Sequence, residues 1–425
     1  MRRRRIRLPN AILTDGHNTR QAIGYNYRRW RDFFNDRQLL GLGWLHEAIA
    51  RLPDTSTRDA FLTLFSGLLE FNNLFASYKG EGTGAVRHMF SHHILKPERT
   101  PIEANVWGTP KSSGSFSNLF RSRLLRAIDY RSRPFEIASN GSVKIVSCSA
   151  PFTGRVETRW PTERRFNPRG IYLSCGSSDE TPLPDKSVDL IVTDPPFFDN
   201  VHYSELADFF YAWQKLRPRG FLNGAASTRH IKEVQDKEAT AFSIKLRSVF
   251  SECYRTLKQA GLLVFTYHHS RAEGWLSLAE AVYGSGFSII NAHPVKAEMS
   301  VATPKAQAKN PIQLDIILVC RKQPDDSRPT ASTRDAFLKA KKLAGEKLGR
   351  LSASGLKLSR NDCRVALYSQ FLAALGPLAK ATDASFALIE QEIALDETAW
   401  AEADRHDLEN KNVESPLIQE PMLFP

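Results

Sequence analysis

The sequence has few cysteines, and no two of them lie close together. The five, Cys148, Cys175, Cys253, Cys320 and Cys363, are scattered along the chain without a CxxC pair. Zinc ribbons and disulfide frameworks both need paired or closely spaced cysteines, so we expect neither of them and predict no metal site. Scattered thiols are typical of proteins in a reducing cytoplasm, which is the location that we predict.

Long apolar runs are also lacking. No stretch reaches the roughly 20 residues that a membrane-crossing helix needs, so we expect no membrane association. The first residues, MRRRRIRLP, are basic, but no apolar core follows them. A secretory signal peptide requires such a core, and we therefore do not expect one.

What the sequence does have is an excess of basic side chains. It contains 58 Lys and Arg residues against 46 Asp and Glu residues, a formal net charge of +12. Clustered basic side chains gain from displacing counterions on phosphate backbones, and this balance favours a nucleic acid as partner. The alternative is a basic surface with no special partner.

The pattern along the chain divides it into three regions. Residues 1–140 show mainly helical apolar spacing and carry basic residues, among them Arg121, Arg123 and Arg126, which predicts a helical region with possible DNA contacts. Residues 141–323 alternate short β-rich runs with helices. Residues 324–425 are expected to form a linker, a helical cap and an acidic tail.

The alternation in residues 141–323 predicts an α/β fold with a mostly parallel sheet covered by helices on both faces. Strand candidates include residues 143–148, 171–175 and 262–267. The last two candidates, residues 287–291 and 314–320, have no helix between them, so we expect them to form an antiparallel pair at one edge of the sheet.

One stretch organises this region. Residues 188–192 are a largely apolar run of strand length that stops at Thr193-Asp194-Pro195-Pro196. Two consecutive prolines donate no N–H to a sheet ladder and hold φ near −65°, so the strand must end there. The carboxyl ends of strands in open α/β sheets are where ligands bind, and this end carries an acid and a rigid loop.

The residue order suits the activation of an exocyclic amino group. A carboxylate and a fixed carbonyl can accept the two amino hydrogens, and an aromatic ring can stack on the base. Asp194, Pro195, Pro196 and Phe197 supply these parts in sequence. The alternative is that Asp-Pro-Pro only turns the chain.

The run TDPPFF resembles the DPPY, NPPY or DPPF motif of S-adenosylmethionine-dependent amino-methyltransferases that act on DNA. The longer run DPPFFDNVHYSELADFFYAW is similar to the signature of large adenine-specific DNA methylases of the DUF1156 type. Weaker likenesses, including VFTYHH and IILVCRK, extend the resemblance over residues 16–322. It implies a Rossmann-like methyltransferase sheet with an antiparallel edge strand, S-adenosyl-L-methionine as cofactor, DNA as partner, and a place in restriction–modification.

The resemblance also implies roles for particular residues. Asp194, Pro195, Pro196 and Phe197 would form the amino-group site, and Phe198 and Tyr203 would contact the substrate. Asp179 would hold the adenine or ribose end of the cofactor, with Glu180 and Asp185 as neighbouring alternatives. Asp208 would support the loop or the target pocket. We expect His268 and His269 to be structural or rim residues rather than a general base.

The chain departs from the family at the cofactor. The family carries a Gly-rich loop after its first strand, and no such loop stands before Asp194. Gly80-Glu81-Gly82-Thr83-Gly84 matches only by letter, since we expect no strand before it. The chain therefore resembles the C-terminal two-thirds of a longer methylase, and we expect a second polypeptide to carry the loop if the chain lacks it.

Three functional interpretations stay open. The first is an adenine amino-methyltransferase acting on DNA, with cytosine as an alternative target because its amino group presents the same two hydrogens. The second is a catalytically silent DNA-binding subunit. The third, an RNA or protein-glutamine amino-methyltransferase, is less favoured by the basic charge.

Overall fold

The computed structural model describes residues 6–78, 86–91, 95–98, 101–108, 112–137, 145–147, 154–157, 160–161, 166–167, 169–198, 201–216, 225–297, 311–323, 332–375, 386–387 and 389–391. The chain forms two compact units. The first consists of Met1–Ser177, Asp199–Gln235 and Val301–Pro304, and the second of Ser178–Phe198, Asp236–Ser300 and Lys305–Pro425. The chain thus leaves the second unit directly after the Asp-Pro-Pro-Phe-Phe run. The three regions drawn from composition stay a prediction.

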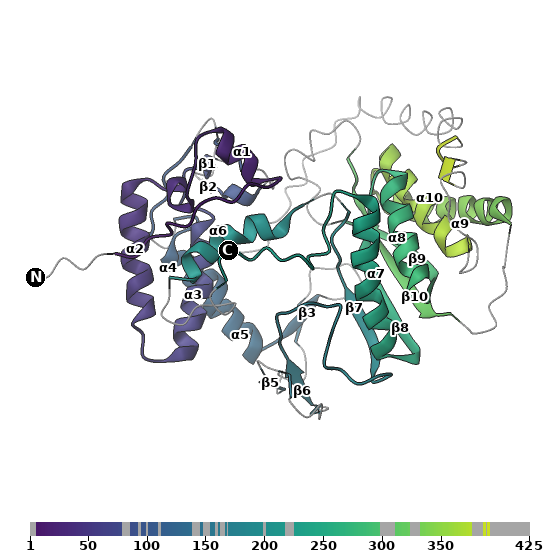
Figure 1. Cartoon of the computed structure of the whole chain (residues 1–425), viewed down its shortest axis with the longest axis horizontal. Coiled ribbons are helices and arrows are strands. Elements are labelled where there is room, and N and C mark those ends of the chain that lie inside the picture. The colour runs from purple at the N-terminus through teal and green to yellow at the C-terminus, as the bar shows by residue number, and fades with distance from the viewer. Residues whose placement is uncertain are drawn as a thin grey trace, which may run out of the picture. The chain divides into compact units, whose positions relative to one another are not determined.

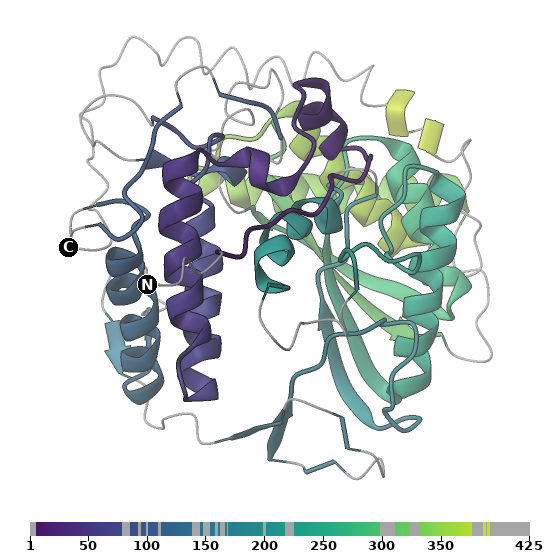
Figure 2. The ribbon, with the colours of Figure 1, turned by 60° about the vertical axis from the view of Figure 1, so that its left-hand side comes forward.

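The first unit is mainly helical, as predicted. Helices α2 (Asp36–Ala50) and α3 (Thr55–Leu69) lie side by side (Figures 1 and 2). Asn35 caps α2 by accepting from the Gln38 N–H at 2.8 Å. Asp54 caps α3 in the same way by accepting from the Thr57 N–H at 2.6 Å. These side chains satisfy N–H groups that have no partner inside the helix.

The core of the first unit is aromatic, and helix α6 (Tyr203–Gln214) supplies much of it. Phe209 of α6 stacks on Phe34 with ring centroids 5.6 Å apart, and Trp213 meets Phe65 edge-on at 5.5 Å. Such pairs add to the free energy already gained by burying the rings. The helix that follows the Asp-Pro-Pro run is therefore held by the first unit.

The remaining elements of the first unit are short. They are α1 (Thr19–Gly24), η1 (Trp30–Phe33), β1 (Ser77–Tyr78), β2 (Val86–Arg87), η2 (Met89–Ser91), α4 (Phe116–Leu119), η3 (Phe120–Leu125), α5 (Arg126–Ser132), β3 (Phe135–Ile137), β4 (Ile145–Ser147), β5 (Arg155–Glu157) and β6 (Gly170–Tyr172).

The second unit is built on a sheet with the strand order β7-β8-β10-β9. These are β7 (Val188–Thr193), β8 (Leu257–Tyr267), β9 (Phe287–Lys296) and β10 (Leu314–Lys322). β7 pairs parallel with β8, and β10 pairs antiparallel with both β8 and β9. Three strands therefore run one way and β10 runs against them, which confirms the mixed α/β fold.

The expected antiparallel pair at one edge of the sheet is confirmed as β9 and β10. The position of the antiparallel strand differs from the expectation, which placed that strand at the edge. The strand that runs against the others is β10, which lies between β8 and β9, while β9 forms the edge. β10 can take this place because it comes last along the chain and runs antiparallel to both neighbours, so it needs no crossover helix on either side.

Helices α7 (Ala239–Thr256) and α8 (Ala272–Gly284) pack on each other and on the sheet (Figure 1). Alternate residues of β8 and β10 are buried toward this layer, among them Phe265 and Leu318, which are each at most 1% exposed. Helix α10 (Arg360–Leu375) packs on β9, β10 and α8, and α9 (Thr333–Ala353) packs on α10. None of the described helices is both long and apolar enough to cross a membrane.

Three strand predictions were wrong in detail. Within the described residues, the run at 143–148 contains β4 and the run at 171–175 contains the end of β6. β4 pairs with β3 and β6 pairs with β5, and they do not join the four-stranded sheet. β8 begins at Leu257 rather than at residue 262, because the pairing with β7 continues across an irregularity at Gly261. A two-residue strand, β1, does precede the glycines at 80–84, which lie outside the described residues.

Candidate active site

Asp194 lies at the carboxyl end of β7, where the prolines end the strand as predicted. Its side chain is exposed, and its Oδ1 accepts a hydrogen bond from the hydroxyl of Thr266 on β8. The register explains the contact, since Thr193 lies opposite Phe265 and the next residues along each strand meet at the same edge. The carboxylate is thus oriented by a side chain that the sequence did not single out.

The two phenylalanines that follow have different surroundings. The half-buried ring of Phe197 meets Tyr267 edge-on at 5.5 Å and lies 4.5 Å from the ring of His268. Phe198 is 1% exposed and packs against Phe242. Its φ of +51° lies in the left-handed region that non-glycine residues seldom adopt, so the surrounding packing must hold it there.

This turn decides which ring is available to a ligand. The Phe198 ring also has His269 at 5.5 Å, with the guanidinium of Arg271 5.6 Å from its centroid. The structure therefore places Phe198, expected at the substrate, in the packing beneath the loop. Phe197 is the ring that lies at the rim beside Asp194.

The two histidines after β8 also differ. Nδ1 of His268 is bonded to the carboxylate of Asp315, which stands near the start of β10. His269 is 8% exposed, and its Nδ1 lies 3.2 Å from both the backbone nitrogen and the carbonyl oxygen of Arg271. Its carbonyl accepts from the Trp275 indole at 2.8 Å, so His269 ties the end of β8 to α8. Only His268 lies at the rim with Phe197.

The loop before β7 is held by an ion-pair network on α7. Arg255 pairs with Glu252 at 2.7 Å and with Asp185, and it donates to the carbonyl of Leu183 at 2.9 Å. Glu252 accepts from both the N–H and the hydroxyl of Thr181, and its hydrogen bonds, first of all from Arg255, lower its pKa. Asp185 thus serves as an anchor of this loop.

Asp179, expected to hold the cofactor, lies half-buried in a turn within the second unit. The strand that precedes it in sequence is β6, which pairs only with β5 in the described part of the chain. Asp179 therefore does not follow a strand of the four-stranded sheet. Its role at a cofactor stays a prediction.

Helix α6 carries two buried carboxylates in the first unit, one expected and one missed. Asp208 accepts from the Ser227 hydroxyl at 2.5 Å and from the Thr228 N–H at 2.6 Å. Glu205 accepts from three successive backbone N–H groups, those of His17, Asn18 and Thr19, at 2.7–3.1 Å. Both acids thus hold other segments of the chain against α6. Tyr203 on the same helix, expected at the substrate, is 53% exposed.

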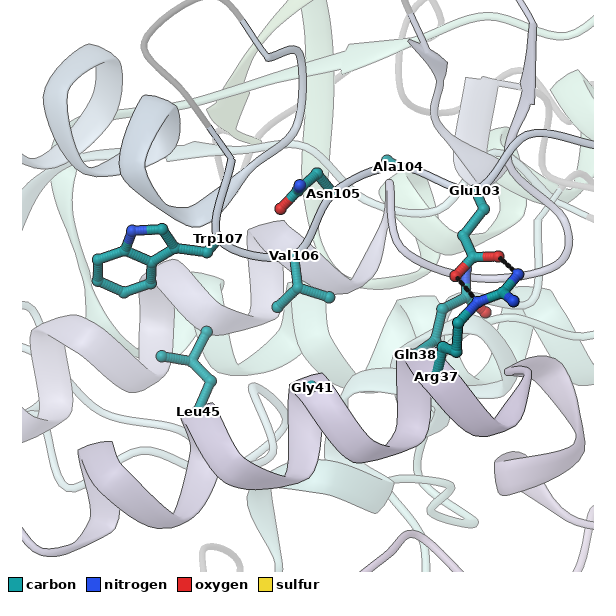
Figure 3. A pocket seen from close by; sticks show the side chains of 9 residues that line it. All are labelled: Arg37, Gln38, Gly41, Leu45, Glu103, Ala104, Asn105, Val106 and Trp107. Carbon is teal, nitrogen blue, oxygen red and sulfur yellow. Dashed lines mark hydrogen bonds and ion pairs between the residues drawn. The ribbon is translucent and has the colours of Figure 1, made fainter.

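A pocket of about 390 Å³ lies in the first unit between α2 and residues 103–107 (Figure 3). Arg37 and Glu103 close one end with an ion pair of 2.6 Å, and Trp107, 62% exposed, stands at the other. The guanidinium of Arg37 holds the pKa of the Glu103 carboxyl below its usual range. With that acid neutralised by its partner, the pocket offers surface for binding but no acid–base pair.

The described side chains of His, Cys, Asp and Glu do not gather in threes as a metal site requires. Four polar residues lie together at one end of the strands of the four-stranded sheet, where β7 and β8 end and β10 begins: Asp194, Thr266, His268 and Asp315. This arrangement suits the binding of a planar group that carries hydrogen-bond donors beside the ring of Phe197.

Comparison with known proteins finds a family model that matches the region containing these residues. Residues 188–362, from the start of β7 to the first turn of α10, match a family model described as DNA methylase, of the N6/N4 type. No curated protein matches the chain.

Two solved structures match part of the chain, both of a candidate DNA modification methylase from Thermus thermophilus. The selenomethionine derivative is 18% identical over 41% of this chain and 72% of that one, with a TM-score of 0.20. The complex of that protein with S-adenosyl-L-methionine is 18% identical over 47% and 74%, with a TM-score of 0.22. Scores this low do not define a common fold. The family match concerns one segment: residues 188–362 are similar to DNA methylase domains of the N6/N4 type.

Proposed function

We propose that the protein transfers a methyl group from S-adenosyl-L-methionine to the exocyclic amino group of adenine in DNA. The observation that carries the proposal is the oriented carboxylate of Asp194, fixed by Thr266 at the end of β7 inside the matched domain. We also propose that the protein is an adenine-specific methylase of the DUF1156 type. In this proposal it is cytoplasmic and acts in restriction–modification.

The residues of the loop have distinct roles in this proposal. The Asp194 carboxylate accepts one amino hydrogen, and the carbonyl of Pro195 accepts the other. Both bonds favour the pyramidal nitrogen that has its lone pair available for attack. The two prolines fix the backbone, so the acceptors are in place before the base arrives. Phe197 stacks on the base, which must leave the duplex to reach this edge.

The described residues do not provide a complete cradle for the methyl donor. In this part of the chain, no glycine-rich loop follows a strand of the four-stranded sheet. S-adenosyl-L-methionine supplies an activated methyl group when bound, and Asp179 is our candidate contact to it.

We propose that a second polypeptide completes the donor site by adding a strand beside β7. Among the described residues β7 pairs only with β8, and its Leu190 and Val192 are 54% and 70% exposed. The opposite edge differs, because Gln370 of α10 donates to the Ala292 carbonyl of β9 at 2.8 Å. An open edge with exposed apolar side chains is a surface that proteins usually cover.

The test is radiolabelled methyl transfer to unmethylated DNA, by the chain alone and together with the product of a neighbouring reading frame that carries a strand and a Gly-rich loop. We expect label in wild type and at least a 100-fold loss in Asp194→Ala. Asp189→Asn is the matched control, since Asp189 is an exposed acid on the same strand that pairs with Lys258 at 2.7 Å.

Nucleoside analysis of the labelled DNA then identifies the target. N6-methyladenine supports the proposal, and N4-methylcytosine assigns the same site to cytosine. Label that appears only in RNA or protein would contradict DNA as the substrate. No transfer to any of these, with no donor binding by calorimetry, would leave a silent DNA-binding subunit.

A further inference from the structure

His268 and Asp315 form a dyad at the same sheet edge as Asp194. The register pairs Ile316 with Tyr267, so the next residues outward, Asp315 and His268, face each other across β10 and β8. Nδ1 of the imidazole is bonded to Oδ1 of the carboxylate. The side chains are only 15% and 22% exposed, so the pair is largely shielded from water and its geometry is fixed by the two strands.

The carboxylate determines the form of the imidazole. A carboxylate accepts hydrogen bonds, so the neutral ring must carry its proton on Nδ1 and leave the lone pair of Nε2 exposed as an acceptor. This is the arrangement by which an acid holds a histidine in the tautomer that can take a proton. His269 is not built this way, because its Nδ1 faces the backbone of Arg271 rather than a carboxylate, and its ring faces Phe198 on the buried side.

The dyad lies beside the groups that would hold the amino group. His268 directly follows β8 and lies two residues after Thr266, so both side chains point to the same face of the sheet, and the hydroxyl of Thr266 donates to Asp194. The imidazole centroid is 4.5 Å from the ring of Phe197. A base stacked on Phe197 with its amino group at Asp194 would therefore have the imidazole at its rim.

The proposed reaction creates a proton that must leave. The amino nitrogen uses its lone pair to bond the methyl carbon of a sulfonium donor, and the carbon–sulfur bond breaks with its electron pair going to sulfur. The nitrogen then holds one proton too many. We propose that Nε2 of His268, oriented by Asp315, accepts this proton and passes it to solvent. The role rests on the proposed function, with His268 as catalytic residue and Asp315 as positioning residue.

Among the described residues, few charged and titratable groups lie around His268. Asp315 faces it from β10 and Asp194 lies beyond Thr266 at the end of β7. On β9 the nearest titratable residue of the same face is His293, opposite Ile317 of β10. His293 is exposed and lies away from the loop, which makes it a matched control.

The first experiment measures the tautomer of His268 in the full chain without donor or DNA, by ¹⁵N NMR on labelled histidine. The His268→Gln variant assigns the signals. We expect the neutral ring to be protonated on Nδ1, and Asp315→Asn to shift the population toward the Nε2–H form. An Nε2–H ring in wild type, or no change in the variant, would overturn the dyad regardless of any activity.

The second experiment measures single-turnover methyl transfer. We expect His268→Ala to lower the rate about 100-fold, the scale of general base catalysis, with little change in DNA affinity. Added imidazole should restore part of the rate, and the fall in rate at acidic pH should vanish in His268→Ala. Asp315→Asn should lose roughly tenfold or more, and His293→Ala should match wild type.

A loss without imidazole rescue, with the acid limb unchanged, would assign His268 a structural role and overturn the proposal. So would a rate within threefold of wild type. If wild type transfers no methyl group while the tautomer is as expected, the proposed function fails and the proton-accepting role fails with it. If Asp194→Ala loses transfer and His268→Ala keeps it, only the role of His268 fails.

Discussion

The hydroxyl of Thr266 on β8 donates a hydrogen bond to the carboxylate of Asp194 on the neighbouring strand end. We expect Thr266→Val, which keeps the shape and removes the donor, to lower the rate of methyl transfer about tenfold. A hydrogen bond to a charged group contributes about 1.5–3 kcal/mol, and the exposure of Asp194 places the effect at the lower end. Thr266→Ser retains the donor and should stay near the wild-type rate. Equal rates for the valine variant and wild type would show that Asp194 needs no such support.

Gly274 allows α8 to begin close to His269. A Cβ at this position would lie 2.5 Å from Nδ1 of His269, whose ring is buried. We expect Gly274→Ala to lower the free energy of unfolding by about 1–3 kcal/mol, measured in urea, because the ring has no room to move. Gly345→Ala on α9 is the control. Nothing lies within 4 Å of its Cβ, so it should be neutral or stabilising. The same loss in both variants would contradict a local clash.

The buried imidazole of His46 should make the stability of the first unit depend on pH. Burial beside Phe65 and Trp213 lowers the pKa of His46 to about 4. The unfolded chain, with an ordinary histidine pKa near 6.5, binds the proton first as pH falls. Stability is therefore full above about pH 6.5 and decreases toward pH 4, by roughly 3 kcal/mol for this group.

The measurement is urea unfolding of wild type and His46→Leu at several pH values between 7 and 4.5. The difference in unfolding free energy between the two proteins should change over this window, because other titrating groups contribute equally to both. A constant difference would mean that the imidazole of His46 has the same pKa in the folded and the unfolded protein.

We expect DNA phosphates to bind at the helical stretch formed by η3 and α5. Its arginines at 121 and 131 are exposed. We expect Arg121→Gln with Arg131→Gln to weaken DNA binding similarly for all sequences and to reduce the slope of log affinity against log salt by about 1 per lost phosphate contact. Lys339→Gln with Lys342→Gln on α9 removes the same charge from another exposed surface. Equal effects of the two pairs would indicate only a general response to net charge.

The sequence predicted those parts of the fold that depend on local chemistry. The two prolines ended β7 where expected, because neither of them can donate an N–H to the sheet ladder. The antiparallel pairing of the last two strands followed from the missing helix between them.

The parts that sequence did not predict depend on distant partners. The run FFYAW in α6 shows that its aromatic rings are buried, but nothing in it shows that they pack on residues near position 34. Asp315 lies 47 residues after His268, so no local pattern joins them. Phe197 and Phe198 are neighbouring phenylalanines that the sequence alone does not distinguish. The backbone turn at Phe198 buries its ring and leaves the ring of Phe197 at the rim.

The place of β10 sets the order in which the site can form during synthesis. β9 pairs only with β10 in the described sheet, and β8 needs β10 on the side away from β7. The strand that carries Thr266 and leads into His268 is therefore flanked on both sides only after Lys322 has left the ribosome. At about 5–20 residues per second, this follows the synthesis of Asp194 by roughly ten seconds. A chain stalled before residue 314 would leave β8 and β9 each without the strand that joins them in the sheet.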